Sequence, residues 1–124
     1  MAIQYAGKVY SDVMNDGTNT YYSDPECNAK LGMAEKFFIE ARTSNVTGTT
    51  PTLAIALESS NDNVNWVPRS TVIVATAIAS GTTLTGSELG TAAVGGRFQR
   101  FTLKLAGTTP NAYVELWVTA RNAF

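Results

Sequence analysis

Apolar and polar residues alternate along most of this chain, and the clearest alternation lies near its end. Apolar side chains occupy every second position in Phe101–Leu105 and again in Val114–Val118. Such alternation places one set of side chains on a buried face and the other toward water. Gly107-Thr108-Thr109-Pro110 separates the two runs and suits a turn better than a strand interior. Residues 98–120 therefore predict a β-hairpin.

The same strand–turn–strand pattern occurs earlier in the chain. Phe37, Ile39 and Ala41 alternate with a face that is polar except for Phe38, and after a second Gly-Thr-Thr-Pro, residues 48–51, Leu53, Ile55 and Leu57 alternate with small alanines. Two copies are too few for a repeat solenoid. Two interpretations stay open: similar hairpins on facing or neighbouring sheets, or the same turn chemistry used twice.

Other segments also show strand-like patterns, whereas no segment predicts a convincing helix and Asn28–Glu35 is expected to be a loop. The further expected strands are Ile3–Tyr10, Tyr21–Tyr22, a bulged strand at Trp66–Val67 ended by Pro68, Thr71–Ala79 and a short strand at Thr83–Leu84. About eight short strands predict an all-β fold, an antiparallel β-sandwich or jelly roll. A length of 124 residues fits one domain over residues 1–124.

The charge content is low. Only 15% of residues are charged, the net charge is −1, and nothing in this balance indicates binding to nucleic acid or to an anionic membrane. There is no apolar run of about 18 residues that would predict a membrane-spanning helix, and the first residues lack the pattern of a signal peptide. The lone Cys27 cannot form an internal disulfide, which favours a reducing compartment.

The residues offer little for catalysis. The chain contains no histidine, which excludes a Ser-His-Asp triad and most zinc sites. Glu40, Glu58 and Glu115 are expected on solvated strand faces rather than as a catalytic pair. Asn61-Asp62-Asn63 carries oxygen ligands for a cation, but a turn is the favoured interpretation. We expect no enzyme activity, no metal and no cofactor.

Aromatic residues provide the candidate site. Tyr113 and Trp117 share one face of the last strand. Together with Tyr21, Tyr22 or Trp66, they are candidates for a sugar-stacking platform or for a buried subunit interface or loop contact. Interface or loop packing is the favoured interpretation.

One stretch resembles a known family. Leu53 to Val67 reads LAIALESSNDNVNWV, and Ser60-Asn61-Asp62 with Trp66, after a Gly-Thr-Thr-Pro turn, resembles a pattern of small β-sandwich structural proteins of tailed bacteriophages, which include capsid decoration, or cement, proteins. The usual glycine after Asn-Asp is Asn63 here, and asparagine also adopts left-handed turn conformations.

The resemblance implies a virion structural protein, made in the host cytoplasm, that binds the major capsid protein on the outside of an assembled head. It also implies a homo-oligomer, with a trimer favoured, since symmetry multiplies modest contacts. The alternative is a carbohydrate-binding module or tail-associated adhesin, based on the tyrosine and tryptophan residues.

Overall fold

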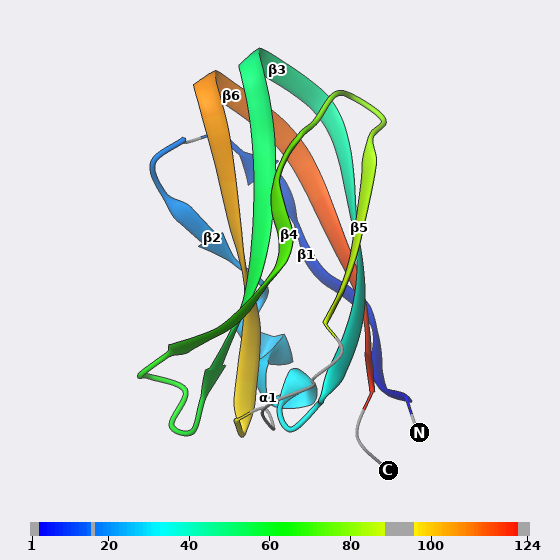
Figure 1. Cartoon of the computed structure of the whole chain (residues 1–124), viewed down its shortest axis with the longest axis vertical. Helices are drawn as coiled ribbons and strands as arrows, with labels where there is room; N and C mark the ends of the chain where they lie inside the picture. Colours follow the sequence, from blue (N-terminus) through cyan, green and yellow to red (C-terminus); the bar gives the residue numbers. More distant parts are fainter. Residues whose placement is uncertain (1–2, 16, 89–95, 122–124) are drawn as a thin grey trace.

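The computed structural model describes residues 3–15, 17–88 and 96–121, which form two layers of antiparallel strands (Figure 1). The elements in chain order are β1 (Ile3–Met14), β2 (Thr20–Tyr22), the 3₁₀ helix η1 (Pro25–Cys27), α1 (Asn28–Leu31), β3 (Lys36–Ser60), β4 (Val67–Ala77), β5 (Thr83–Glu88) and β6 (Phe98–Arg121).

Two long, bent strands, β3 and β6, link the layers. They pair antiparallel over their whole length, from Lys36 opposite Arg121 to Ser60 opposite Phe98. Each bends at its Gly-Thr-Thr-Pro segment, so that its first arm lies in one layer and its second arm in the other (Figure 1). The predicted hairpins are therefore wrong, because the arms of each long strand pair with the other long strand and not with each other. A sharp bend and a hairpin turn need the same residues, and the sequence pattern does not distinguish them.

Each layer contains an arm of both long strands. In the first sheet the order is β1, the second arm of β6, the first arm of β3, and β5. In the second sheet it is β2, the first arm of β6, the second arm of β3, and β4. When the arms are counted separately, these orders are those of an eight-stranded jelly roll. The predicted fold class, an antiparallel β-sandwich or jelly roll, is confirmed.

The two bends face each other at one end of the sandwich. Gly48 and Gly107 have φ of 105° and 131°, and Thr50 and Thr109 have φ of 47° and 46°. A Cβ atom on Gly48 would lie 2.7 Å from the Thr109 carbonyl oxygen, and one on Gly107 would lie 2.9 Å from that of Thr49. Glycine is needed here for both its conformation and its small size.

The core fills the space between the inner faces of the two sheets. Phe37 of the first sheet meets Phe101 of the second edge to face, with ring centroids 5.4 Å apart. Aliphatic side chains surround this pair, and the fully buried ones include Ile39, Leu53, Ile55, Leu57, Leu103, Leu105 and Leu116. The alternation in the sequence thus identified the buried face of both long strands.

Two local predictions need correction. The segment predicted as a loop before β3 contains the short helix α1, because Leu31 is fully buried at the end of the core and fixes a helical turn. Pro68 does not end a strand, since β4 runs through it to Ala77. Proline is tolerated there because β4 is the last strand of the second sheet.

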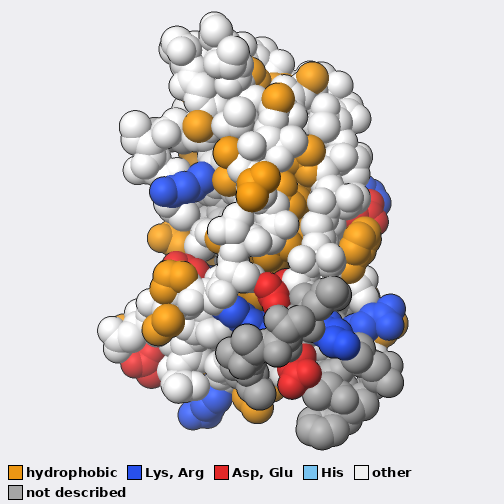
Figure 2. Space-filling view, in the orientation of Figure 1, with side chains coloured by type: hydrophobic (Ala, Val, Ile, Leu, Met, Phe, Trp, Pro, Cys, Tyr) orange, Lys and Arg blue, Asp and Glu red, His pale blue; other side chains and the backbone are white. Residues whose placement is uncertain are grey.

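Charged side chains are unevenly distributed. Residues 43–57 and 105–114, which form the bends and the adjoining strands, contain no charged residue. Figure 2 accordingly shows mostly uncharged polar and hydrophobic atoms over the upper part of the molecule and most of the charged groups toward the opposite end. Within the described ranges, neither helix is long and apolar enough to cross a membrane.

Candidate functional site

The outer face of the first sheet carries a cluster of aromatic and charged side chains. Alternation in β6 turns Val114, Leu116 and Val118 inward and leaves the intervening residues on the outer face. Residues that pair across antiparallel strands share a face, and β1 and β3 each place further residues opposite this part of β6. We call the resulting set the Trp117 face: Lys8, Phe38, Glu40, Arg42, Tyr113, Glu115 and Trp117.

Trp117 lies at the centre of this face, with a cation on either neighbouring strand. Lys8 Nζ lies 5.7 Å and Arg42 Cζ 5.1 Å from the indole ring centroid. The indole Nε1 donates a hydrogen bond to Glu115 Oε1 at 3.4 Å. These contacts position the indole over the sheet while it stays only partly buried.

The cations of the Trp117 face are balanced by carboxylates. Lys8 Nζ lies 3.8 Å from Glu115 Oε2, and Arg42 Nη2 donates to Glu40 Oε2 at 3.4 Å. Both pairs are partly exposed, so each contributes little to stability. Because the four charges are paired, the face offers hydrogen-bond donors and acceptors while these four side chains carry no net charge.

Tyr113 extends the aromatic surface along β6. Its hydroxyl lies 2.5 Å from Ser11 Oγ and donates to Glu115 Oε2 at 3.5 Å. Trp117 lies four positions after Tyr113, which corresponds to about 13 Å along a strand. Phe38, 47% exposed, adds an apolar side chain on the neighbouring strand.

Two adjoining hollows follow this row of side chains. One, of about 310 Å³, is lined by Phe38, Glu40, Arg42 and Trp117 among others. The next, of about 240 Å³, is lined by Arg42, Tyr113 and Glu115 with Thr43 and Ser44. Arg42 lines both, so the two open hollows adjoin each other along β6, and this arrangement suits an extended ligand better than an enclosed small molecule.

The other predicted aromatic residues lie elsewhere. Tyr22 and Trp66 are on the outer side of the second sheet, where their ring centroids lie 4.0 and 4.1 Å from Arg100 Cζ. Tyr21 packs against the core and its hydroxyl accepts a hydrogen bond from the Asn15 backbone amide at 3.2 Å. The structure therefore does not bring Tyr21, Tyr22 or Trp66 beside Tyr113 and Trp117, since these residues belong to different layers of the sandwich.

The motif behind the phage resemblance makes a local turn. Ser60 Oγ accepts hydrogen bonds from the backbone amides of Asp62 and Asn63, and Asp62 Oδ1 accepts from those of Val64 and Asn65. The backbone amides of Asn65 and Val64, with the side chains of Asn65 and Ser60, donate to the Asp62 carboxylate and lower its pKa well below the ordinary value. The favoured interpretation of these residues as a turn agrees with this geometry.

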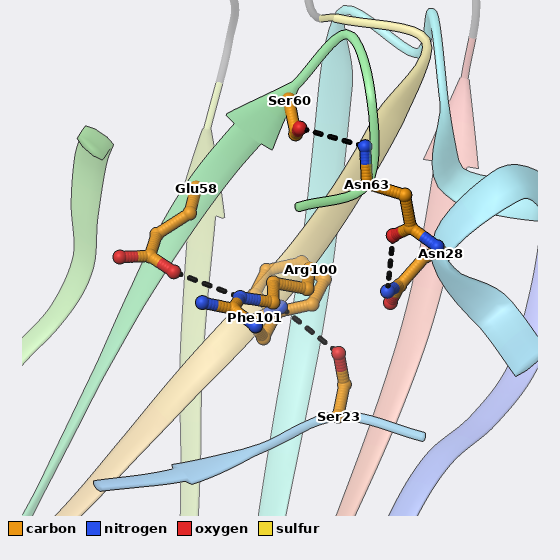
Figure 3. A network of polar contacts seen from close by, with 7 residues as sticks. All are labelled: Ser23, Asn28, Glu58, Ser60, Asn63, Arg100 and Phe101. Atoms are coloured by element: carbon orange, nitrogen blue, oxygen red, sulfur yellow. Dashed lines mark hydrogen bonds and ion pairs between the residues drawn. The ribbon is translucent and has the colours of Figure 1, made fainter. Parts of the chain in front are cut away.

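The three carboxylates considered for catalysis each lie beside a cation. Glu58 Oε1 accepts from Arg100 Nε at 2.8 Å, and Glu40 and Glu115 belong to the Trp117 face. Figure 3 shows Glu58 and Arg100 on adjacent strands, near the hydrogen bonds that join Ser60, Asn63 and Asn28. Among the described residues, no group of three or more His, Cys, Asp or Glu side chains is placed to hold a metal ion.

Sequence reasoning did not assign Phe38, Arg42 or Lys8 to the site. Alternation alone places Phe38 and Arg42 on the outer face of the first arm of β3, so their direction was predictable. Their position beside Trp117 could not be predicted, because it depends on the pairing of β3 with β6, whose residues are far apart in the sequence.

Comparisons with known proteins identify the fold. No family model and no curated protein matches the sequence. Among solved structures, the chain is similar to the CBM22-1 xylan-binding domain from Paenibacillus barcinonensis Xyn10C, with 14% identity, a TM-score of 0.57, and coverage of 99% of this chain and 97% of that one.

A second similar structure holds the CBM22-1 and GH10 modules of the Clostridium thermocellum endo-1,4-beta-D-xylanase 10B in complex with xylohexaose. The identity is 9%, the TM-score is 0.56, and the match covers 95% of this chain but spans only 29% of that two-module chain. Both neighbours have the β-sandwich fold of carbohydrate-binding domains, and neither points to a capsid decoration protein.

Proposed function

We propose that this chain is a non-catalytic carbohydrate-binding module that binds an extended, neutral polysaccharide chain on the Trp117 face. The observation that carries the proposal is the partly exposed indole of Trp117 in an open hollow, with Tyr113 about 13 Å further along the same strand. An aromatic ring offers an apolar surface to the C–H face of a sugar, and the flanking polar groups supply partners for its hydroxyls.

The charge of the face supports a neutral ligand. Two cations and two carboxylates alternate around Trp117 and pair with each other, which leaves hydrogen-bonding capacity without a net field to attract an ion. The similarity to two xylan-binding domains supports β-1,4-linked xylan as the first polysaccharide to test.

The capsid-decoration hypothesis has less support. It depends on Ser60-Asn61-Asp62 and Trp66, and hydrogen bonds within the turn account for Ser60 and Asp62 without any capsid partner. Binding to a major capsid protein and trimer formation remain predictions from the resemblance. Light scattering on the purified chain measures its oligomeric state and so tests trimer formation directly.

Retention in native gels that contain soluble polysaccharides tests the proposed function. Wild-type protein is expected to be retarded by xylan, and Trp117→Ala to lose most of that retardation, because removing a central aromatic side chain typically costs about 2 kcal/mol of binding, or roughly 30-fold in affinity. Val74→Ala is the control, since Val74 is exposed on β4 and lies outside the aromatic clusters. The proposal would be refuted if xylan, mixed-linkage glucan and mannan all failed to retard the wild-type protein. It would also be refuted if both variants lost retardation to the same extent.

A further inference from the structure

The sandwich is built from two similar halves. The first half, β1-β2-β3, has strands of 12, 3 and 25 residues, and the second half, β4-β5-β6, has strands of 11, 6 and 24. In each half a long outer strand is followed by a short strand and then by a long strand bent at Gly-Thr-Thr-Pro. β1 lies beside the second arm of β6, and β4 lies correspondingly beside the second arm of β3. An approximate two-fold axis between the bends therefore exchanges the two sheets.

This symmetry relates the Trp117 face to one position on the second sheet. Trp117 is ten residues after Gly107, and Glu58 is ten residues after Gly48. Trp117 pairs across the strands with Glu40, and Glu58 pairs with Arg100. The pair Arg100 and Glu58 thus occupies, on the opposite side of the sandwich, the place that Glu40 and Trp117 occupy on the first sheet.

The equivalent position also combines aromatic rings with a cation. The guanidinium of Arg100 lies about 4 Å from the rings of both Tyr22 and Trp66, which come from β2 and from the turn before β4. Two rings at that distance both contact the guanidinium and restrict its movement. We call this set, Tyr22, Glu58, Trp66 and Arg100, the Arg100 face.

The hydrogen bonds of Arg100 leave part of its guanidinium available. Nε donates to Glu58 Oε1, as Figure 3 shows, and the two terminal amino groups donate to no other described residue. Lys104, exposed on the same side of β6, adds a second cation, so that the outer side of these two arms carries two cations and one carboxylate. An arginine fixed in this way is suited to bind a carboxylate through two parallel hydrogen bonds.

We propose that the Arg100 face is a second glycan-binding site, and that it recognises the carboxylate of a uronic acid residue. Arg100 pairs with Glu58 through Nε alone, so its terminal amino groups can bind the carboxylate of an acidic sugar, and Lys104 adds a second cation about 13 Å further along β6. Because the two faces lie on opposite sides of the sandwich, one molecule binds two chains at once and links them. This site extends the proposed function, but its test is separate.

The two tryptophans of the chain provide one reporter for each face. In ¹H–¹⁵N correlation spectra, each indole N–H gives its own signal, Trp117 for the first face and Trp66 for the second. The probe is xylotetraose with a 4-O-methylglucuronic acid branch, and the control is the same molecule with its carboxyl group reduced to an alcohol. We expect the acidic probe to shift the Trp66 signal and the reduced probe to leave it in place, whereas both shift the Trp117 signal.

Variants assign the carboxylate contact. Arg100→Gln is expected to weaken the Trp66 response to the acidic probe about tenfold or more. Lys104→Gln, an exposed change that leaves the packed rings intact, is expected to weaken it several-fold. The dispersion of the spectra shows whether each variant is folded.

An unmoved Trp66 signal with the acidic probe, or equal shifts with the acidic and reduced probes, would overturn the second site. A Trp66 shift without any Trp117 shift would support the second site and refute the proposed function, so the two failures are distinguishable.

Discussion

Replacement of Gly107 by alanine tests the close approach of the two bends. Its φ of 131° is unfavourable for alanine, and the added Cβ would lie 2.9 and 3.0 Å from the carbonyl oxygens of Thr49 and Thr50. Both oxygens belong to the backbone of the facing bend, which cannot move aside as a side chain would. We expect a loss in unfolding free energy of about 3 kcal/mol, of which the left-handed conformation accounts for about 1–2 kcal/mol.

Gly81→Ala is the matched control for this prediction. Gly81 also has a positive φ, 87°, but a Cβ atom there would meet no atom within 4 Å. Gly81→Ala is expected to lower the free energy of unfolding by about 1 kcal/mol, the cost of the unfavourable backbone conformation alone. The difference between the two variants therefore measures the contact between the bends.

Urea unfolding followed by tryptophan fluorescence gives these free energies. Gly48→Ala is expected to cost about as much as Gly107→Ala, since its Cβ would lie 2.7 Å from the Thr109 carbonyl oxygen. The double variant is expected to cost less than the sum, because the first change already separates the bends. A cost for Gly107→Ala within about 0.5 kcal/mol of that for Gly81→Ala would refute the account of the bends.

Two further predictions concern the half-buried Tyr10 and the buried Gln99. Burial, with nearby Asp12 and Tyr21, raises the pKa of Tyr10 to about 12. The protonated Tyr10 hydroxyl should therefore contribute fully to stability below pH 10, the pKa of tyrosine in the unfolded chain, and this contribution should be lost between about pH 10 and 12. In urea titrations over that pH range, Tyr10→Phe should not show this loss of stability. A pH profile of Tyr10→Phe identical to that of the wild type would contradict the assignment. Gln99 is fully buried, donates to the carbonyl oxygens of Leu31 and Ala34, and accepts from Arg69. Gln99→Leu should cost about 2–4 kcal/mol in thermal unfolding, because three hydrogen bonds are lost and one of them comes from the charged Arg69 guanidinium. A neutral effect would show that the other hydrogen bonds of these groups compensate for the loss.

The sequence predicted the fold class well because alternation records burial directly. Leu53–Leu57 and Phe101–Leu105 face the core as predicted, and each short strand lies at or beside its predicted position. The bends were predicted as hairpin turns because glycine and proline indicate that the chain changes direction but not which strands pair on either side. Which strand a segment pairs with depends on residues far away in the sequence, from 38 positions for Ser60 and Phe98 to 85 for Lys36 and Arg121.

The candidate site could be predicted only in part for the same reason. Tyr113 and Trp117 share a strand, so alternation placed them on one face. Their relation to Trp66 and Tyr22 depends on which sheet each segment joins, and the structure places these two on the opposite side. The cations beside Trp117 come from β1 and β3, which only the sheet order brings to it.

The central claim is that the Trp117 face binds a neutral glycan, and calorimetric titration of the wild-type chain with xylohexaose tests it most directly. The proposed function predicts saturable binding with one neutral ligand per chain, weakened roughly 30-fold in Trp117→Ala and unchanged in Trp66→Ala. The absence of binding heat in the wild type, or an affinity that Trp117→Ala leaves intact, would contradict the claim.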